Sequence, residues 1–270
     1  MQGSSRAAFV AGRDAFAAAL GSGGDWSALA EELFGAMGAL DSNAALRRAL
    51  VDPSRDRTAK RGLVEALFGP RMSAATTGVL KVLVSQHWAD DRDLGDAIET
   101  LAVEAVVASA EAGGTLEALE DDLFRFERLV AADSGLREAL GAGGGDDNAK
   151  GALVSALLNG KSSTETIRLA RQAAISPRGR RFSRVLESYL AVVATRREQL
   201  NATVTVAAPL TGVQRQRLAV ALTRIYDRTV QLNVVLDPAV VGGIRVQVGD
   251  EVVDGTILRR LREAEQALMR

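Results

Sequence analysis

Two glycine-containing segments of this chain resemble loops that hold phosphate groups. Gly160-Lys161-Ser162 has the ending of the P-loop, whose backbone N–H groups and lysine bind phosphate oxygens. That motif needs a glycine five positions earlier, where this chain has Ser155, and it follows a strand, whereas 149–158 has a helical pattern. The glycine-rich segment 141–145 also follows a helical run, without the βαβ pattern of a dinucleotide site. We therefore expect turns between helices at both places and no bound cofactor.

Three carboxylates near the C-terminus, Asp237, Asp250 and Asp254, are the next candidates for chemistry, as metal ligands or acid–base groups. Each occupies a turn position, where aspartate usually bonds its own backbone. The chain has no cysteine and a single histidine, His87, which excludes thiolate chemistry and His-rich metal sites. We expect His87, beside Trp88, to be packed at a helix end. The sequence therefore predicts no catalytic residues and no metal site.

A run of arginines between positions 168 and 184 is the strongest local charge feature. Such runs usually form a solvated helix face. The alternative is a docking face for an acidic partner helix or for anionic lipids. A nucleic-acid partner is not expected, because the net charge is −1 and only Phe182 interleaves with the arginines. The candidate docking residues are Arg178, Arg180, Arg181 and Arg184.

Length and composition indicate the elements that would have to position these groups. At 270 residues the chain exceeds one typical domain, so we expect two or three compact units. Aromatic residues make up only 4%, so the core must be built from alanine, leucine and valine. Since no run of 18 apolar residues occurs and the first twenty residues lack a signal-peptide pattern, we expect a soluble, intracellular protein.

Residues 1–200 have a helical pattern almost throughout. The segment 4–20 is rich in alanine and places Phe9 and Phe16, seven residues apart, on one face. Asp52-Pro53 predicts a turn, because the residue before proline is disfavoured in a helix. Residues 79–84 are apolar nearly all round, which predicts a helix at the centre of a bundle.

An internal repeat relates the two halves of this helical region. The segment 46–50 returns as 136–140, ninety positions later, and after a two-residue slip Leu94 and Glu99 correspond to Phe182 and Glu187. Further pairs keep the offset of ninety: Asp56 and Asp146, Lys60 and Lys150, Val64 and Val154, Ser73 and Ser163, Thr76 and Thr166. We predict two related helical modules, 1–112 and 113–200, of which only the first has an opening helix.

The chain changes character after residue 200. Alternating segments predict strands at 203–207, 230–236 and 244–248, and Thr211 with Gln214 forms a capping-box pattern before a helix. Gly249-Asp250 predicts a tight hairpin turn, and apolar spacing predicts a terminal helix from Ile257. The predicted fold is mainly α with a small α+β C-terminal domain: duplicated helical-bundle modules followed by a βαββα domain at 201–270.

The order of turn residues in the tail resembles the C-terminal signature of a known family. The residues are Asp237, Pro238, Gly242, Gly243, Gly249, Asp250, Asp254 and Gly255. This string, with Pro209 after the first strand, is similar to the delta subunit of F-type ATP synthases, called the oligomycin-sensitivity-conferring protein in mitochondria. The two helical modules suggest the long form found in actinobacteria. Independently of the resemblance, glycine at 242 and 243 is expected to supply positive φ in a turn.

The resemblance implies a non-catalytic stator subunit that ties the catalytic head to the peripheral stalk, so that the head resists rotor torque during proton-driven ATP synthesis. It implies that the first helical module binds N-terminal segments of the alpha subunits, with Phe9 and Phe16 as the candidate interface. The C-terminal domain would bind the C-terminal end of stalk subunit b, and the second module would add a spacer or a stalk contact through its arginines.

The same resemblance implies a location at the cytoplasmic face of the bacterial plasma membrane, with membrane association only through the complex. Two alternatives stay open at this stage. One is a general helical scaffold or adaptor that binds another partner through its C-terminal domain. The other is an enzyme that uses ATP or phosphate, which only the incomplete glycine motifs support.

Overall fold

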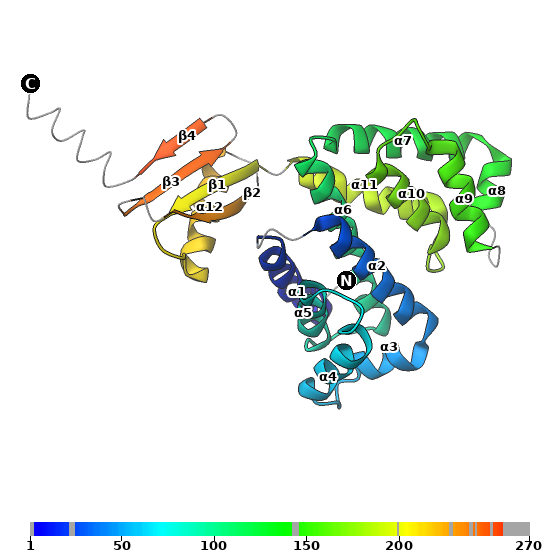
Figure 1. Ribbon diagram of the computed structural model, residues 1–270, viewed down its shortest axis with the longest axis horizontal. Helices are drawn as coiled ribbons and strands as arrows, with labels where there is room; N and C mark the ends of the chain where they lie inside the picture. The colour runs from blue at the N-terminus through cyan, green and yellow to red at the C-terminus, as the bar shows by residue number, and fades with distance from the viewer. Residues whose placement is uncertain are drawn as a thin grey trace, which may run out of the picture. The chain divides into compact units, whose positions relative to one another are not determined.

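The computed structural model describes residues 3–21, 25–141, 146–198, 200–226, 229–237, 240, 242–248 and 251–255 (Figure 1). Its contacts divide the chain into two compact units, Met1–Ala194 and Thr195–Arg270. The first unit is helical and covers the first predicted module and the second up to Ala194, and the predicted boundaries at 112 and 200 stay predictions. The mainly α fold with a small α+β C-terminal part is confirmed.

The helices of the first unit follow one another closely along the chain, and the last of them continues into the second unit. They are α1 (Ser4–Gly21), α2 (Trp26–Ser42), α3 (Ala44–Val51), α4 (Arg57–Phe68), α5 (Ala74–Val84), α6 (Asp91–Ala112), α7 (Leu116–Ala132), α8 (Ser134–Gly141), α9 (Asp147–Leu158), α10 (Thr164–Ile175) and α11 (Phe182–Glu198). The predicted turn at Asp52-Pro53 is confirmed, because α3 ends at Val51 and α4 begins at Arg57.

Side-chain caps begin these helices at matching positions in the two modules. Asp56 and Asp146 accept backbone N–H groups at the starts of α4 and α9, at 2.8 and 2.9 Å. Ser73 and Ser163 do the same for α5 and α10, at 3.2 and 3.1 Å. Each cap supplies an acceptor for an N–H group that has no partner inside its own helix.

The internal repeat is confirmed in the positions of the helices and in their burial. Helices α7, α8, α9 and α10 each begin ninety positions after α2, α3, α4 and α5. In the next pair of helices, α6 and α11, the buried residues keep an offset of 88, which confirms the two-residue slip. These pairs are Leu94 and Phe182, Ile98 and Leu186, Leu101 and Tyr189, and Ala105 and Val193.

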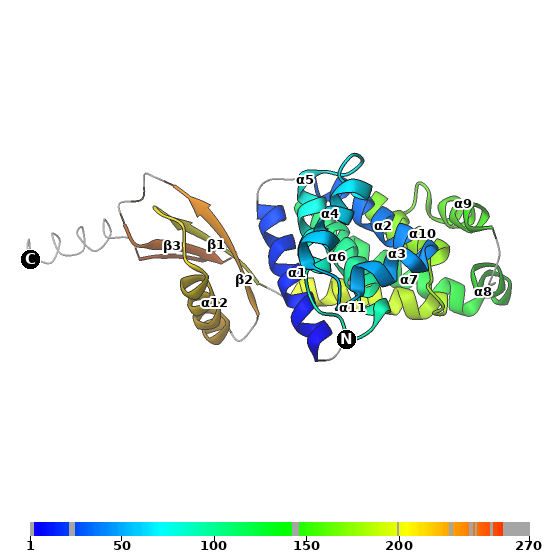
Figure 2. The same ribbon diagram turned by 90° about the horizontal axis from the view of Figure 1, so that it is seen from below.

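Helix α6 belongs to both copies. It packs against α2 and α1 on the side of the first copy and against α10 and α7 on the side of the second (Figures 1 and 2). Its buried residues Ile98 and Val106 lie ninety positions after Ala8 and Phe16, which are buried in α1. The second copy therefore has an opening helix, contrary to the sequence-based expectation, and that helix is α6.

The helix expected at the centre of the bundle from residues 79–84 is α5, which packs against α1, α4 and α6. Its apolar positions are largely buried, but α6 is buried more completely and around more of its circumference. The carboxylates of Asp96, Glu99 and Glu104 conceal this in the sequence, because a helix with acidic residues along its middle does not have the pattern of a central helix.

The second unit is a four-stranded mixed sheet with one described helix. The strands β1 (Leu200–Val206), β2 (Val230–Leu236), β3 (Ile244–Val248) and β4 (Glu251–Asp254) lie in the order β2-β1-β3-β4. Strand β1 is antiparallel to β3 and parallel to β2. The parallel pair needs a crossover connection, which α12 (Gly212–Tyr226) forms between β1 and β2. Leu222 of α12 and the inward residues of the strands, such as Val204 and Val246, form its core. The predicted terminal helix lies outside the described residues.

The turn chemistry predicted for the tail is confirmed where the structure describes it. Thr211 and Gln214 form the capping box: the Thr211 N–H donates to Gln214 Oε1 at 2.8 Å, and the Gln214 N–H donates to Thr211 Oγ1 at 3.3 Å. Gly242 and Gly243 have φ of +71° and +83°. Val248 pairs with Glu251 in the antiparallel ladder of β3 and β4, and the tight turn predicted at Gly249-Asp250 lies outside the described residues.

Candidate interaction surfaces

The glycine segments that resemble phosphate loops lie between helices. Gly160 has φ of +72° in the turn from α9 to α10, and the Lys161 N–H donates to the carbonyl oxygen of Leu158 at 3.0 Å. The turn that the sequence predicts there is confirmed. Gly141 ends α8, and residues 142–145 lie outside the described ranges. Neither segment follows a strand, whereas a P-loop and a dinucleotide fingerprint both do.

His87 was expected to pack at a helix end, and this is wrong. It is exposed in the segment after α5, whereas its neighbour Trp88 is buried and donates its indole N–H to the carbonyl oxygen of Leu83 at 2.8 Å. The described ranges hold no group of three or more His, Cys, Asp or Glu side chains arranged to bind a metal ion. Asp237 contributes its backbone N–H to the carbonyl oxygen of Val206 at 3.0 Å, which fits the turn position predicted for it.

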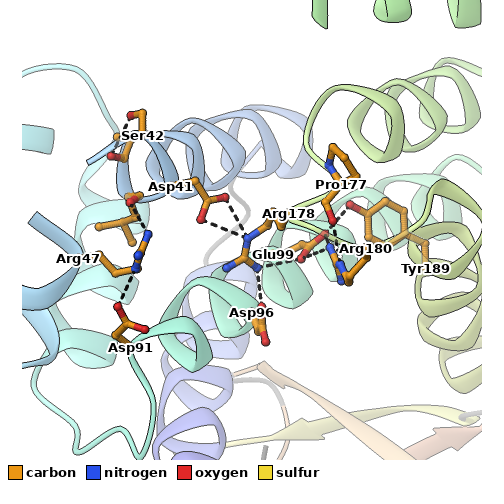
Figure 3. A network of polar contacts seen from close by, with 12 residues as sticks. Asp41, Ser42, Arg47, Asp91, Asp96, Glu99, Pro177, Arg178, Arg180 and Tyr189 are labelled. Carbon is orange, nitrogen blue, oxygen red and sulfur yellow. Dashed lines mark hydrogen bonds and ion pairs between the residues drawn. The ribbon is translucent and has the colours of Figure 1, made fainter. Parts of the chain in front are cut away.

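A partly buried ion network joins the two copies, and Arg178 is at its centre (Figure 3). The Nη1 of Arg178 lies 2.6 Å from Asp96 Oδ1 and 3.1 Å from Glu99 Oε2, both on α6. Its Nε lies 2.9 Å from Asp41 Oδ2 and donates a hydrogen bond of better direction to Oδ1 at 3.2 Å. Arg178 therefore ties the turn between α10 and α11 to both α2 and α6.

Arg180 and Tyr189 complete this network at Glu99. The Arg180 Nη2 lies 2.6 and 2.7 Å from the two oxygens of Glu99, and the Tyr189 hydroxyl donates to Oε1 at 2.7 Å. Burial lowers the pKa of Arg178. The carboxylates of Asp41, Asp96 and Glu99 together raise this pKa by more than burial lowers it, so it lies above its ordinary value. Burial and the charge of Glu99 raise the pKa of Tyr189 well above its ordinary value.

The four arginines expected to form one docking face are divided by the structure. Arg178 is only 9% exposed, and Arg178 and Arg180 bind carboxylates of their own chain. Arg181 and Arg184 are exposed, and Arg184 pairs with Glu187 at 2.8 Å. The signal that sequence reasoning missed is Glu99, a carboxylate inside the mostly apolar run 97–110. Such a residue needs a cationic partner when it is buried.

The two phenylalanines of the opening helix are also placed differently. Phe16 is buried in the core of the unit, whereas Phe9 is half-buried and packs against that core. Both phenylalanines therefore face the core, and a partner at α1 would meet the side of the helix on which Val10 is exposed. Helix α1 itself packs against α5 and α6.

A wide groove of about 1810 Å³ lies where the two copies meet, between α2 and the helices α7 to α10. Its lining alternates in charge and includes Glu31, Arg47, Glu127 and Arg137 along with Arg180. Mixed charges do not concentrate the positive potential that a nucleotide phosphate requires. The groove therefore gives no support to an ATP-using enzyme.

Residues 103–268 match the family model described as the ATP synthase delta (OSCP) subunit. The chain belongs to this family. A subunit delta from Kineococcus radiotolerans is 49% identical over 91% of this chain and 89% of the relative. Those from Streptomyces avermitilis and Beutenbergia cavernae are 41% and 42% identical, over 98% and 99% of this chain and the same shares of their own.

The delta (OSCP) subunit is a non-catalytic stator component that links the catalytic head of ATP synthase to its peripheral stalk. The family model begins inside α6 and so covers the second copy and the tail, while the first copy precedes it. The Streptomyces and Beutenbergia relatives match over nearly their full length, so they contain the first copy as well. Among the helices that the structure describes, none combines the length and apolar character needed to cross a membrane.

Proposed function

We propose that the two units of this delta subunit bind different parts of ATP synthase. The helical unit binds N-terminal segments of the alpha subunits, and the C-terminal unit binds the C-terminal end of stalk subunit b. The complex lies at the cytoplasmic face of the plasma membrane, and the subunit reaches the membrane only through it. Linking two attachments in one chain makes each effectively intramolecular, which slows release of the head under torque.

The outer face of α1 is the proposed surface for the alpha subunits. Ala7 and Ala18 are exposed there and Ala11 is half-buried. Their counterparts ninety positions later in α6, Ala97, Ala108 and Leu101, are all buried. In α6 this surface is covered because α6 lies between the two copies, against α2 and α10. An amphipathic helix from a partner could cover α1 in the same way, as in helix-in-groove recognition.

The outer face of α12 is the proposed surface for subunit b. Val213, Arg217, Val220 and Arg224 are all exposed and recur at spacings of four, three and four residues. This spacing places two apolar and two basic residues on one face of the helix. The face therefore suits an amphipathic partner helix with acidic residues beside its apolar stripe.

A pair of variants tests this division of labour. Replacing Ala7 and Ala18 by glutamate adds charge to the outer face of α1, and replacing Val220 by aspartate does so on α12. Titration with the N-terminal peptide of the cognate alpha subunit should show at least roughly tenfold weaker binding for the first variant alone. Pull-down of subunit b should fail for the second variant alone. Ala139→Glu, on the exposed side of α8, is the control and should affect neither.

Two results would contradict the proposal. If the alpha peptide binds both variants equally, α1 is not its site. If neither partner binds the unaltered chain at micromolar concentration, the helical unit and the tail do not attach to alpha and b as isolated surfaces.

A further inference from the structure

Comparison of the two copies shows which face of α2 the second copy covers. Phe34 is 7% exposed and Met37 is fully buried, and Asp41, seven residues after Phe34 on the same face, is bound by Arg178. At the start of the helix, Arg168 of α10 lies 2.8 Å from Glu31 and donates a hydrogen bond to the Ser27 hydroxyl at 2.7 Å. This face of α2 thus combines a buried phenylalanine with acidic residues that receive arginines from the second copy.

Helix α7 has the corresponding face, but the face around its phenylalanine is exposed. Ninety positions after Phe34, Phe124 is 56% exposed. Because the same residue type occupies the same place in both copies, the difference in burial comes from the neighbour. In the first copy the neighbour is the second copy, and among the described residues no third copy follows α11.

The charges around Phe124 have the same sign as those that receive arginines on α2. Glu117 and Asp121, the counterparts of Ser27 and Glu31, are exposed, and Glu127 lies half-buried one turn after Phe124. Arg125 is directed along its own helix, with Nη2 3.5 Å from Asp121. Helix α7 contains the acidic residues Glu117, Glu120, Asp121, Asp122 and Glu127 against the two bases Arg125 and Arg128.

We propose that this face of α7 is a further docking surface, which binds a basic helical segment of another ATP synthase subunit. The segment would place an apolar side chain against Phe124 and arginine or lysine side chains against Glu117, Asp121 and Glu127. We infer a basic occupant from charge complementarity. The equivalent face of α2 is bound in this way by two arginines of the second copy, Arg168 and Arg178. This third surface is separate from the faces of α1 and α12.

Site-directed photo-crosslinking in the assembled ATP synthase tests this surface. The chain has no cysteine, so Ala131→Cys gives a single attachment site for a benzophenone label on the exposed side of α7. Ala139→Cys on α8 is the control position. We expect label at 131 to crosslink a lysine- or arginine-rich segment of another subunit, and label at 139 to give a much weaker crosslink.

A second substitution in the labelled chain shows whether Phe124 and the acidic residues carry the contact. Phe124→Asp should lower the crosslink at 131 at least roughly tenfold, and about 0.5 M salt should also weaken it because the charges are exposed. Leu67→Asp, at an exposed apolar residue of α4, is the matched control and should leave the yield unchanged. Equal thermal unfolding of the free variants would show that both fold.

The proposal is overturned by three results. One is a crosslink from position 131 to a second copy of this chain or to a segment without basic residues. Another is an equal yield from positions 131 and 139. The third is a crosslink that Phe124→Asp leaves unchanged while the free variant unfolds like the unaltered chain.

Discussion

Tyr189 donates a 2.7 Å hydrogen bond to the carboxylate of Glu99, and this contact joins the last helix of the second copy to the helix that both copies share. Glu99 is 4% exposed, so its charge is tolerated only because Arg178 and Arg180 also bind it. A stator must transmit load through its own fold. The network therefore holds together the two copies that the duplication produced.

Replacing Glu99 by glutamine should strongly destabilise the helical unit. The change keeps the shape of the side chain but leaves the buried guanidinium of Arg178 and the half-buried one of Arg180 with less compensation, which costs roughly 2–3 kcal/mol. Glu187→Gln removes an exposed carboxylate paired with Arg184 and should cost less than about 1 kcal/mol. Urea unfolding of both variants compares these free energies, and equal losses would show that the network contributes little.

Stability at alkaline pH should depend on Tyr189. Its raised pKa means that the folded chain holds the phenolic proton more tightly than the unfolded chain. The contribution to stability is therefore complete below about pH 10, the unfolded pKa, and declines as pH rises above it. The slope from this one group is at most about 1.4 kcal/mol per pH unit.

Unfolding free energies measured between about pH 8 and 11 for the unaltered chain and for Tyr189→Phe check this dependence. The unaltered chain should lose stability more steeply than the variant above pH 10. Tyr226, the only other tyrosine, also has a raised pKa because its hydroxyl donates to Glu251, so Tyr226→Phe is measured as well to separate the contribution of this second phenol. Parallel curves for the unaltered chain and Tyr189→Phe would contradict the expectation.

The two equivalent serine caps should differ in strength. Ser163→Ala removes a helix cap and should cost about 1 kcal/mol. Ser73→Ala should cost about 1 kcal/mol more, because Ser73 Oγ also donates to the carboxylate of Glu32 at 2.7 Å. Thermal unfolding of the two variants measures the difference. If Ser163→Ala is the more damaging change, the bond to Glu32 does not stabilise the fold.

Two glycines should respond in opposite ways to alanine. A Cβ atom at Gly12 would overlap Leu83 Cδ2, so Gly12→Ala should loosen the contact of α1 with α5 and cost about 1–3 kcal/mol. At Gly62 on the exposed side of α4 a Cβ atom meets nothing within 4 Å, so Gly62→Ala should stabilise by about 0.5–1 kcal/mol. Hydrogen exchange of α1 separates the two: exchange should rise in the first variant only.

Local features of this fold could be predicted well from the sequence. The caps at Ser73 and Ser163, the turn at Asp52-Pro53 and the positive φ of Gly242 follow from backbone preferences within a few residues. The repeat could also be recognised, because alanine and leucine positions keep one offset along the chain. The shared role of α6 could not, because its acidic residues are explained only by partners far away in the sequence.

Phe34 and Phe124 show what the sequence determines and what only the tertiary structure decides. The sequence alone determined that they occupy equivalent positions in duplicated helices and that the tail carries the turn residues of the delta family. Only the tertiary structure decided that Phe34 is buried and Phe124 exposed, and that Arg178 faces inward. Burial depends on which helix packs against a face, and that neighbour is chosen by the packing of the whole unit rather than by local spacing.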